Sequence, residues 1–273
     1  MTATLESRFL ERPNARIHLR QRPAADGRWV VFLHGAGMDG HMFDAQLPAI
    51  PGDMGICVWD ARGHGQSSLA GRFHYQDMVD DLVALLAELN AREVTLVGQS
   101  LGGHLAQTMV ERHGEDLARV VLINCSDNHG PLTWLDKLGL VLFTPIMLLW
   151  PWSSAVRASA KACGNEANTI AYTQRALEAI GRRRFLQVMD FSADVLDPDP
   201  TYRLAVPALL LCGDDDGTGN VRAAMPRLAE RDPNAHLVII GGASHNSNMD
   251  RPDETNRHLV DFLEDRHDHD GQR

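Results

Sequence analysis

The sequence lacks the features that mark several classes of protein. Its four cysteines, Cys57, Cys125, Cys163 and Cys212, include no Cys-x-x-Cys pair, so we expect neither a zinc ribbon nor a thioredoxin-type site. Basic charge is scarce, because 26 Lys and Arg face 36 Asp and Glu and leave a formal net charge of −10. A net negative chain is poorly suited to binding phosphate backbones, and we expect no nucleic-acid partner.

Long apolar segments are missing as well. Residues 1–18 are broken by charges and contain no apolar core of a secretory signal peptide. The longest apolar stretch, 138–152, is interrupted by Pro145 and Pro151 and is too short for a membrane-spanning helix, which needs about 20 residues. Three of the four cysteines lie in apolar runs, which is typical of reduced, buried thiols. We therefore expect a cytoplasmic protein without stable membrane insertion.

What the sequence does contain is a regular alternation of apolar runs and helical periodicity. The 273 residues are 44% hydrophobic and 23% charged, an ordinary globular composition. Continuous apolar runs of strand length indicate burial on both faces of a parallel sheet. These runs are 29–34, 55–60, 93–99, 119–125, 206–213 and 235–242, and helical patterns lie at 76–89, 101–113 and 254–265. The alternation predicts a three-layer α/β fold.

One segment, residues 126–205, interrupts this alternation. It is rich in Leu, Met, Trp and Phe and contains no convincing buried strand. We interpret it as a helical cap over a core formed by residues 1–125 and 206–273, and as the wall of an apolar pocket. The alternative is a set of helices that only pack on the core. The run Arg182 to Arg184 within it is either a solvated helix face or a site for an acidic substrate.

The strand pattern at 93–99 ends in the motif Gly-Gln-Ser-Leu-Gly, in which Ser100 is the central residue. A helical pattern follows at once, so the motif lies at a sharp turn from strand to helix. Side chains two residues before and after the serine would collide in such a turn, which explains Gly98 and Gly102. The turn places the Ser100 hydroxyl at a helix N-terminus, where developing negative charge is favoured.

Together with four further motifs, this turn resembles the α/β-hydrolase family. The motifs are His-Gly-Ala-Gly at 34–37, Asp-x-Arg-Gly-x-Gly-x-Ser at 60–67, Gly-x-x-Asp at 213–216 and a histidine loop at 241–245. The resemblance covers nearly the whole chain. It implies the α/β-hydrolase fold, with a mostly parallel central sheet flanked by helices and a helical cap inserted after the sixth strand.

The resemblance also implies a catalytic triad in the chain order of this fold. Ser100 would be the nucleophile, His245 the general base, and Asp216 the acid that orients His245. The backbone N–H groups of Ala36 and Leu101 would form the oxyanion hole. We expect no cofactor and no metal. The expected reaction is hydrolysis of a carboxylic ester or lactone of a medium-sized hydrophobic small molecule, like that of esterases and lactonases.

Several alternatives stay open from the sequence. Gly217 stands where a proline often follows the triad aspartate, and Asp127 occupies another place from which relatives supply their acid. The same triad also serves C–C bond hydrolases of aromatic catabolism and cofactor-free perhydrolases. A ligand receptor built on a hydrolase fold is the third reading, since a fold does not imply a function. The residues do not indicate an oligomeric state.

Most of the 13 histidines must be bystanders. We interpret His34 as structural, and we expect Asp60 and Arg62 in the neighbouring motif to form a structural pair. His267 and His269 belong to a polar C-terminal tail, where we expect no metal site.

Overall fold

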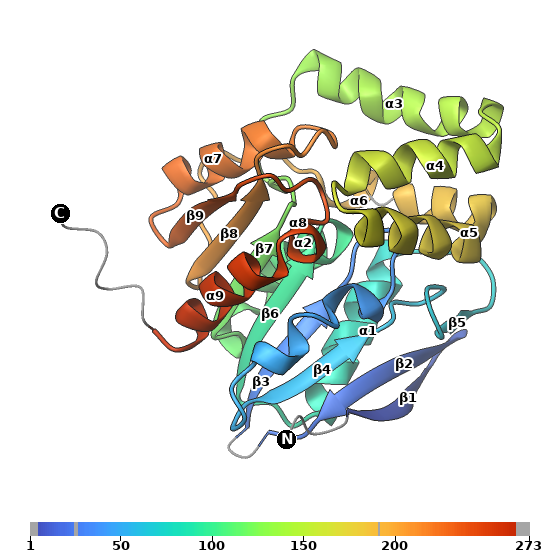
Figure 1. Ribbon diagram of the computed structural model, residues 1–273. Helices are drawn as coiled ribbons and strands as arrows, with labels where there is room; N and C mark the ends of the chain where they lie inside the picture. The colour runs from blue at the N-terminus through green and yellow to red at the C-terminus, as the bar shows by residue number, and fades with distance from the viewer. Residues whose placement is uncertain (1–4, 25–26, 191, 266–273) are drawn as a thin grey trace.

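The computed structural model describes residues 5–24, 27–190 and 192–265, which form a twisted sheet covered by helices (Figure 1). The tail that holds His267 and His269 lies outside these residues. The nine-stranded sheet has the order β1-β2-β4-β3-β6-β7-β8-β9, with β5 paired to β2. The strands are β1 (Glu6–Arg12), β2 (Ala15–Arg22), β3 (Arg28–Leu33), β4 (Gly55–Trp59), β5 (Ser68–Leu69), β6 (Glu93–Gln99), β7 (Arg119–Ile123), β8 (Ala208–Gly213) and β9 (Ala235–Ile240).

The six strands that the apolar runs predict are all present and pair in parallel from β4 to β9. The antiparallel hairpin of β1 and β2 at the sheet edge was not predicted. Its strands carry many charges, and β1 is nowhere fully buried. In β2 the buried Ile17 and Leu19 are flanked by Arg16 and Arg20. Such alternation is typical of an antiparallel strand with one solvated face, and it is a weaker signal than a continuous apolar run.

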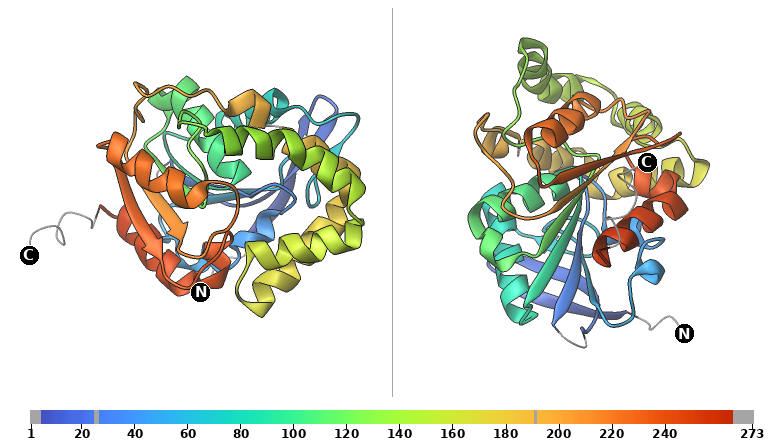
Figure 2. Two further views of the ribbon diagram at one scale, coloured as in Figure 1. Left: turned by 90° about the horizontal axis from the view of Figure 1, so that it is seen from above. Right: turned by 90° about the vertical axis from the view of Figure 1, so that its left-hand side faces the viewer.

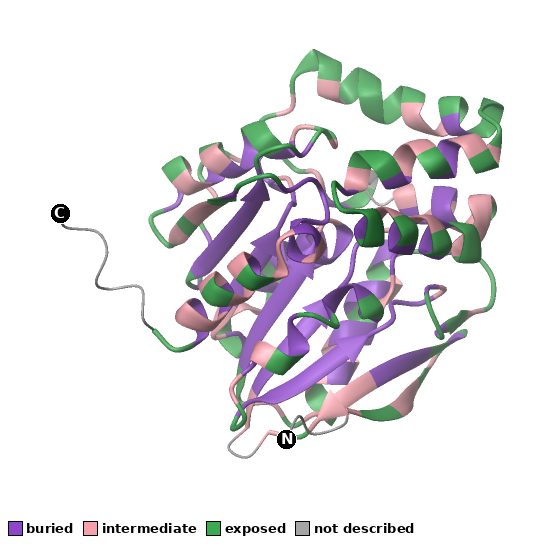
Figure 3. Cartoon of the chain, viewed as in Figure 1, coloured by how far each residue is buried: buried purple, intermediate pink, exposed green. Residues whose placement is uncertain are grey.

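Helices cover both faces of the sheet (Figure 2). The core cluster on one face draws its residues from α1 (Tyr75–Glu88), α2 (Leu101–His113) and α7 (Val221–Arg231). The cluster on the other face draws on the 3₁₀ turn η1 (Gly40–Phe43) and α9 (Pro252–Leu263). Three short elements complete the core: η2 (Leu47–Ala49), η3 (Gly114–Asp116) and α8 (Ser247–Asp250). The predicted helices correspond to α1, α2 and α9. The central strands β3, β4, β6, β7 and β8 are almost wholly buried (Figure 3).

The helical cap lies between β7 and β8, over the carboxyl end of the sheet (Figure 1). It consists of α3 (Trp134–Leu149), α4 (Trp152–Cys163), α5 (Ala167–Met189) and α6 (Ser192–Val195). It follows the sixth strand in chain order when the two-residue β5 is set aside. Gly181, with φ of 74°, kinks α5 near its middle. In the described part of the chain, none of the helices combines the length and apolarity required to cross a bilayer.

Candidate active site

Ser100 lies at the sharp turn between β6 and α2, in a backbone conformation that L-residues rarely adopt. Its φ is 50° and its ψ is −114°. A Cβ atom on Gly98 would overlap the backbone of Gly102, and one on Gly102 would overlap the carbonyl of Leu33. Both glycines are therefore needed for the close approach of β6, α2 and β3. The surrounding packing holds a strained serine in place, which is a common feature of functional sites.

His245 and Asp216 form a buried acid–base pair. His245 Nδ1 lies 2.9 Å from Asp216 Oδ2, which also accepts a hydrogen bond from Asn124 Nδ2 at 2.8 Å. The second carboxylate oxygen accepts from the backbone N–H of Thr218 at 2.8 Å. Burial opposes ionisation of Asp216, but the charge of His245 and these hydrogen bonds outweigh it and hold the pKa of Asp216 below its ordinary value. The carboxylate thus stays charged, and the proton on His245 Nδ1 leaves Nε2 free to act as a base.

Asp127, the alternative acid, has a different partner. Its carboxylate forms an ion pair with Arg231 at 2.8 Å and accepts the backbone N–H of His129 at 2.9 Å. The structure therefore brings Asp216, and not Asp127, to His245.

The two expected oxyanion donors lie on either side of Ser100. Leu101 is the first residue of α2, and the N–H groups of a first helical turn have no partner within the helix. Ala36 lines the same cavity as Ser100. The preceding residue, Gly35, comes so close that a Cβ there would lie 3.3 Å from the Cβ of Ser100. The loop after β3 therefore passes directly beside Ser100.

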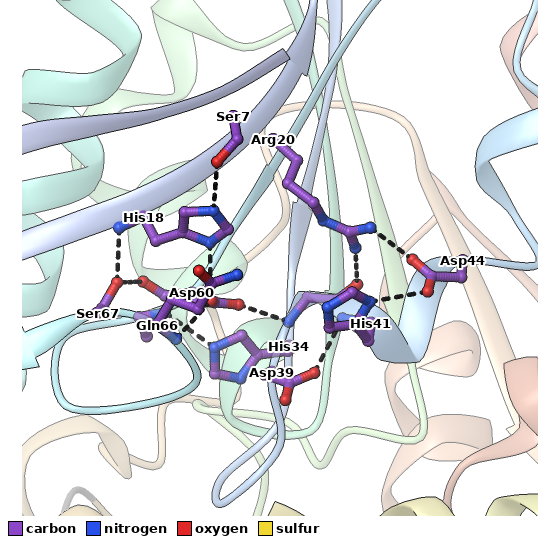
Figure 4. Close-up of polar contacts among 12 residues, drawn as sticks. Ser7, His18, Arg20, His34, Asp39, His41, Asp44, Asp60, Gln66 and Ser67 are labelled. Carbon is purple, nitrogen blue, oxygen red and sulfur yellow. Dashed lines mark hydrogen bonds and ion pairs between the residues drawn. The ribbon is translucent and has the colours of Figure 1, made fainter. Parts of the chain in front are cut away.

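Asp60 fixes this loop from the neighbouring strand (Figure 4). Its side chain accepts the backbone N–H groups of Gly40 and Gln66, both at 2.8 Å, and it contacts His18 Nδ1 at 2.9 Å. The backbone carbonyl of Asp60 accepts the hydroxyl of Ser67 at 2.6 Å. One buried carboxylate thus joins the loop after β3, the loop after β4 and strand β2.

The predicted pair of Asp60 and Arg62 is wrong. The guanidinium of Arg62 binds Asp81 through Nε at 2.8 Å and through a terminal nitrogen at 2.8 Å, and it also reaches Asp77 at 2.6 Å. Both carboxylates lie on α1, so Arg62 fastens the loop after β4 to that helix. The forked guanidinium selects a bidentate carboxylate, and tertiary packing brings Asp81 to it.

His34 links the same two loops through its ring. Nδ1 donates to the carbonyl of Gly35 at 2.8 Å, and Nε2 accepts the backbone N–H of Ala61 at 2.9 Å. Burial lowers the pKa of His34, which keeps the ring neutral and allows Nε2 to accept. Both ring nitrogens of His34 are used to join the two loops, which is the structural role that the sequence predicts for this residue.

A cavity of about 1170 Å³ opens above Ser100 and His245. Its walls come from α2, from the loops after β7 and β8, and from the cap helix α3. Nine of its lining side chains are large and apolar: Phe73, Leu132, Leu135, Leu140, Val141, Phe143, Met189, Leu196 and Val221. The cavity therefore suits a medium-sized apolar molecule placed against the nucleophile.

Sequence reasoning missed several polar residues of this cavity, among them Arg72, His104 and Ser126. His104 Nδ1 contacts Asn128 Oδ1, and Ser126 Oγ lies 3.4 Å from His104 Nε2. Burial lowers the pKa of His104 to about 4. Only one signal could have indicated His104, namely its place one helical turn after Ser100, on the same face of α2.

The arginines of the basic run in the cap, in contrast, donate hydrogen bonds to backbone carbonyls. Arg182 donates to the carbonyls of Leu148 and Trp150 at 3.2 and 2.8 Å. Arg184 donates to the carbonyls of Leu69 and Gly71 at 3.1 and 3.0 Å. These residues fasten the cap helices to one another and to the core, and they do not line the cavity above Ser100.

Comparisons with known proteins identify the family of the chain. A sequence profile of the alpha/beta hydrolase family matches residues 30–258. The non-heme chloroperoxidase CPO-A1 of Kitasatospora aureofaciens is 31% identical over 267 residues, covering 87% of this chain and 92% of that protein. A bromoperoxidase from Bacillus anthracis superposes with a TM-score of 0.81 at 20% identity, covering 96% of this chain and 100% of that chain. An enol-lactonase from Burkholderia xenovorans has a TM-score of 0.76 at 21% identity, with coverages of 94% and 100%. The resemblance that the motifs indicate is confirmed, and the chain belongs to the α/β-hydrolase family.

Proposed function

We propose that this α/β hydrolase cleaves a carboxylic ester or lactone of a medium-sized hydrophobic small molecule through an acyl-enzyme on Ser100. A neutral serine is a weak nucleophile and needs a base to take its proton. His245 Nε2 takes this proton and later returns it to the leaving group, while Asp216 holds the tautomer and stabilises the imidazolium. Water activated by His245 then releases the acid.

The backbone N–H groups of Ala36 and Leu101 are proposed to stabilise the tetrahedral oxyanion. Each donor of this kind contributes about 3–4 kcal/mol in the transition state. The loop that holds Ala36 is joined to the loop after β4 by Asp60 and His34, so this donor is in place before substrate binds.

One observation supports the proposal more than any other. The buried pair of His245 and Asp216 and the strained Ser100 converge at the floor of a single, largely apolar cavity. Apolar walls favour an uncharged substrate, and the charged Asp216 is already paired with the base.

Perhydrolysis is the second candidate, and the 31% identity with a non-heme chloroperoxidase favours it. Here hydrogen peroxide replaces water as the second nucleophile. It attacks the acyl carbon, the bond to Ser100 Oγ breaks, and a peracid leaves in place of the carboxylic acid.

The test is hydrolysis of p-nitrophenyl esters of increasing acyl length by the wild-type protein and by Ser100→Ala. We expect ester turnover that falls by about 10⁶-fold in the variant, as in other serine triads. A residual rate within tenfold of wild type contradicts the mechanism. Peracid formation from the same esters and hydrogen peroxide supports the second candidate. A folded protein without ester turnover would instead favour a C–C bond hydrolase or a hydrolase-fold ligand receptor.

A further inference from the structure

The outer surface of cap helix α3 is apolar along its whole length. Ten large apolar side chains between Trp134 and Trp150 are exposed, from 41% at Trp150 to 88% at Leu149, and seven of them lie outside the lining of the cavity above Ser100. In the described part of the chain, the only other exposed side chain of this kind is Ile239. Single exposed apolar residues are normal, whereas contiguous patches mark interaction sites. Figure 3 shows α3 as a largely exposed helix at the outer edge of the cap.

This helix is apolar on both sides. Its inner side, with Leu135, Leu140 and Phe143, lines the cavity above Ser100. Its outer side includes Leu138, Leu142 and Leu149. In a helix that only covers a core, the solvent side is polar. The outer side of α3 is therefore built to contact something apolar.

The two ends of α3 carry the residues typical of a membrane interface. Trp134 and the exposed Lys137 lie at the N-terminal end. Trp150 lies at the C-terminal end, where Arg182 binds its carbonyl. The one acidic residue of the helix, Asp136, is engaged in a capping box with Thr133. Tryptophan, lysine and arginine side chains each combine an apolar body with a polar tip, and such side chains favour the headgroup region of a lipid surface.

The size of the strip argues against a second copy of this chain as its occupant. A helix of 16 residues is about 24 Å long and presents a face about 10 Å wide. A twofold contact through two such faces alone falls short of the roughly 1,200 Å² that stable protein interfaces bury. A lipid surface needs no complementary partner shape and accepts a single helix lying in its plane.

We propose that α3 is an interfacial docking helix that lies in the headgroup region of a phospholipid surface, with Trp134 and Trp150 at its two ends. The helix rests on the surface and does not cross it. The net charge of −10 opposes an anionic membrane, so the favoured surface is zwitterionic, with Lys137 and Arg182 near lipid phosphates. Docking in this way places the wall of the cavity against the source of an apolar substrate. It does not depend on the ester reaction proposed above.

The test is flotation of the full chain with phosphatidylcholine vesicles. The variants are Ile146→Asp and Leu149→Asp, whose side chains are 51% and 88% exposed and lie outside the lining of the cavity, so that neither the fold nor the pocket is at risk. The matched control is Ile239→Asp on β9, which is 49% exposed and far from α3 in sequence. Circular dichroism of each variant checks the fold, and sedimentation velocity without lipid reports the oligomeric state.

We expect wild type and Ile239→Asp to float with the vesicles and the two α3 variants to bind at least tenfold more weakly. Wild type that stays in the lipid-free fraction overturns the proposal, as does equal flotation of all four proteins. A dimer that does not float and that both α3 variants dissociate also overturns it, in favour of a second copy as the occupant.

Discussion

Gln99 Nε2 donates a hydrogen bond to the backbone carbonyl of His245 at 2.9 Å. The residue before Ser100 therefore holds the loop that carries His245. The same amide group lies 3.3 Å from Asn246 Oδ1, so the contact spans two residues of that loop. Ser100 and His245 are 145 positions apart in the chain. The buried side chain of Gln99, which directly precedes Ser100, links the two segments that carry them.

Replacing Gln99 with Leu should misplace the base without changing the pocket. We expect kcat to fall about 10- to 100-fold with little change in KM, because small displacements of a catalytic group are costly. Steady-state kinetics with a p-nitrophenyl ester measure both constants. Gln174→Leu is the matched control, since that side chain lies on α5 outside the lining of the cavity and binds Glu178. A kcat within twofold of wild type in Gln99→Leu would contradict a positioning role.

Asn substitutions should separate the two candidate acids. Asp216→Asn is expected to lower kcat by about 10⁴-fold, because the amide favours the wrong tautomer of His245. Asp127→Asn should leave kcat within about threefold and lower the free energy of unfolding by about 1–3 kcal/mol, because Arg231 loses a charged partner. Ester kinetics and urea unfolding of both variants check this. The reverse pattern would make Asp127 the triad acid.

The glycines of the cap and the elbow should respond oppositely to alanine. Gly102→Ala forces a Cβ into the Leu33 carbonyl, so we expect a loss of about 3 kcal/mol or more in the free energy of unfolding. Gly139→Ala in α3 meets no atom within 4 Å and should gain about 0.5–1 kcal/mol. Urea unfolding curves measure both. A stable, active Gly102→Ala protein would argue against the close approach of α2 and β3.

The protein should lose stability on acidification at pH values well above the range in which carboxylates titrate. Burial lowers the pKa of His64 to about 3 and that of His104 to about 4, from an ordinary value of 6.5. Unfolding exposes both rings, so between about pH 6 and pH 4 the unfolded chain binds about two more protons than the native state. The stability these neutral rings contribute is fully present above pH 6.5 and is lost as the pH falls. Urea midpoints at pH 7, 6 and 5 should decline steadily, and less steeply in His104→Gln. A constant midpoint would show that the rings are not buried and neutral.

The fold was predictable because its strongest signals are local. A continuous apolar run such as 119–125 indicates a buried strand, whichever strands it pairs with. Gly98 and Gly102 indicate the sharp turn around Ser100 in the same local way. The hairpin of β1 and β2 escaped prediction because one face of an edge strand stays polar. The partner of Arg62 was predicted wrongly because a neighbour in sequence was preferred to Asp81, which only the packing of α1 against the loop brings close.

The order of strands, helices and triad motifs was determined by the sequence alone, because backbone sterics and burial act over a few residues at a time. Tertiary structure alone decided which carboxylate meets His245, since Asp127 and Asp216 both follow buried strands and differ only in what packs against them. It also decided that α3 exposes its apolar outer side. The apolar residues of this helix indicate from the sequence alone that contact with an apolar environment is favourable. Only the position of the helix on the core shows which of its sides is covered by protein and which is left exposed.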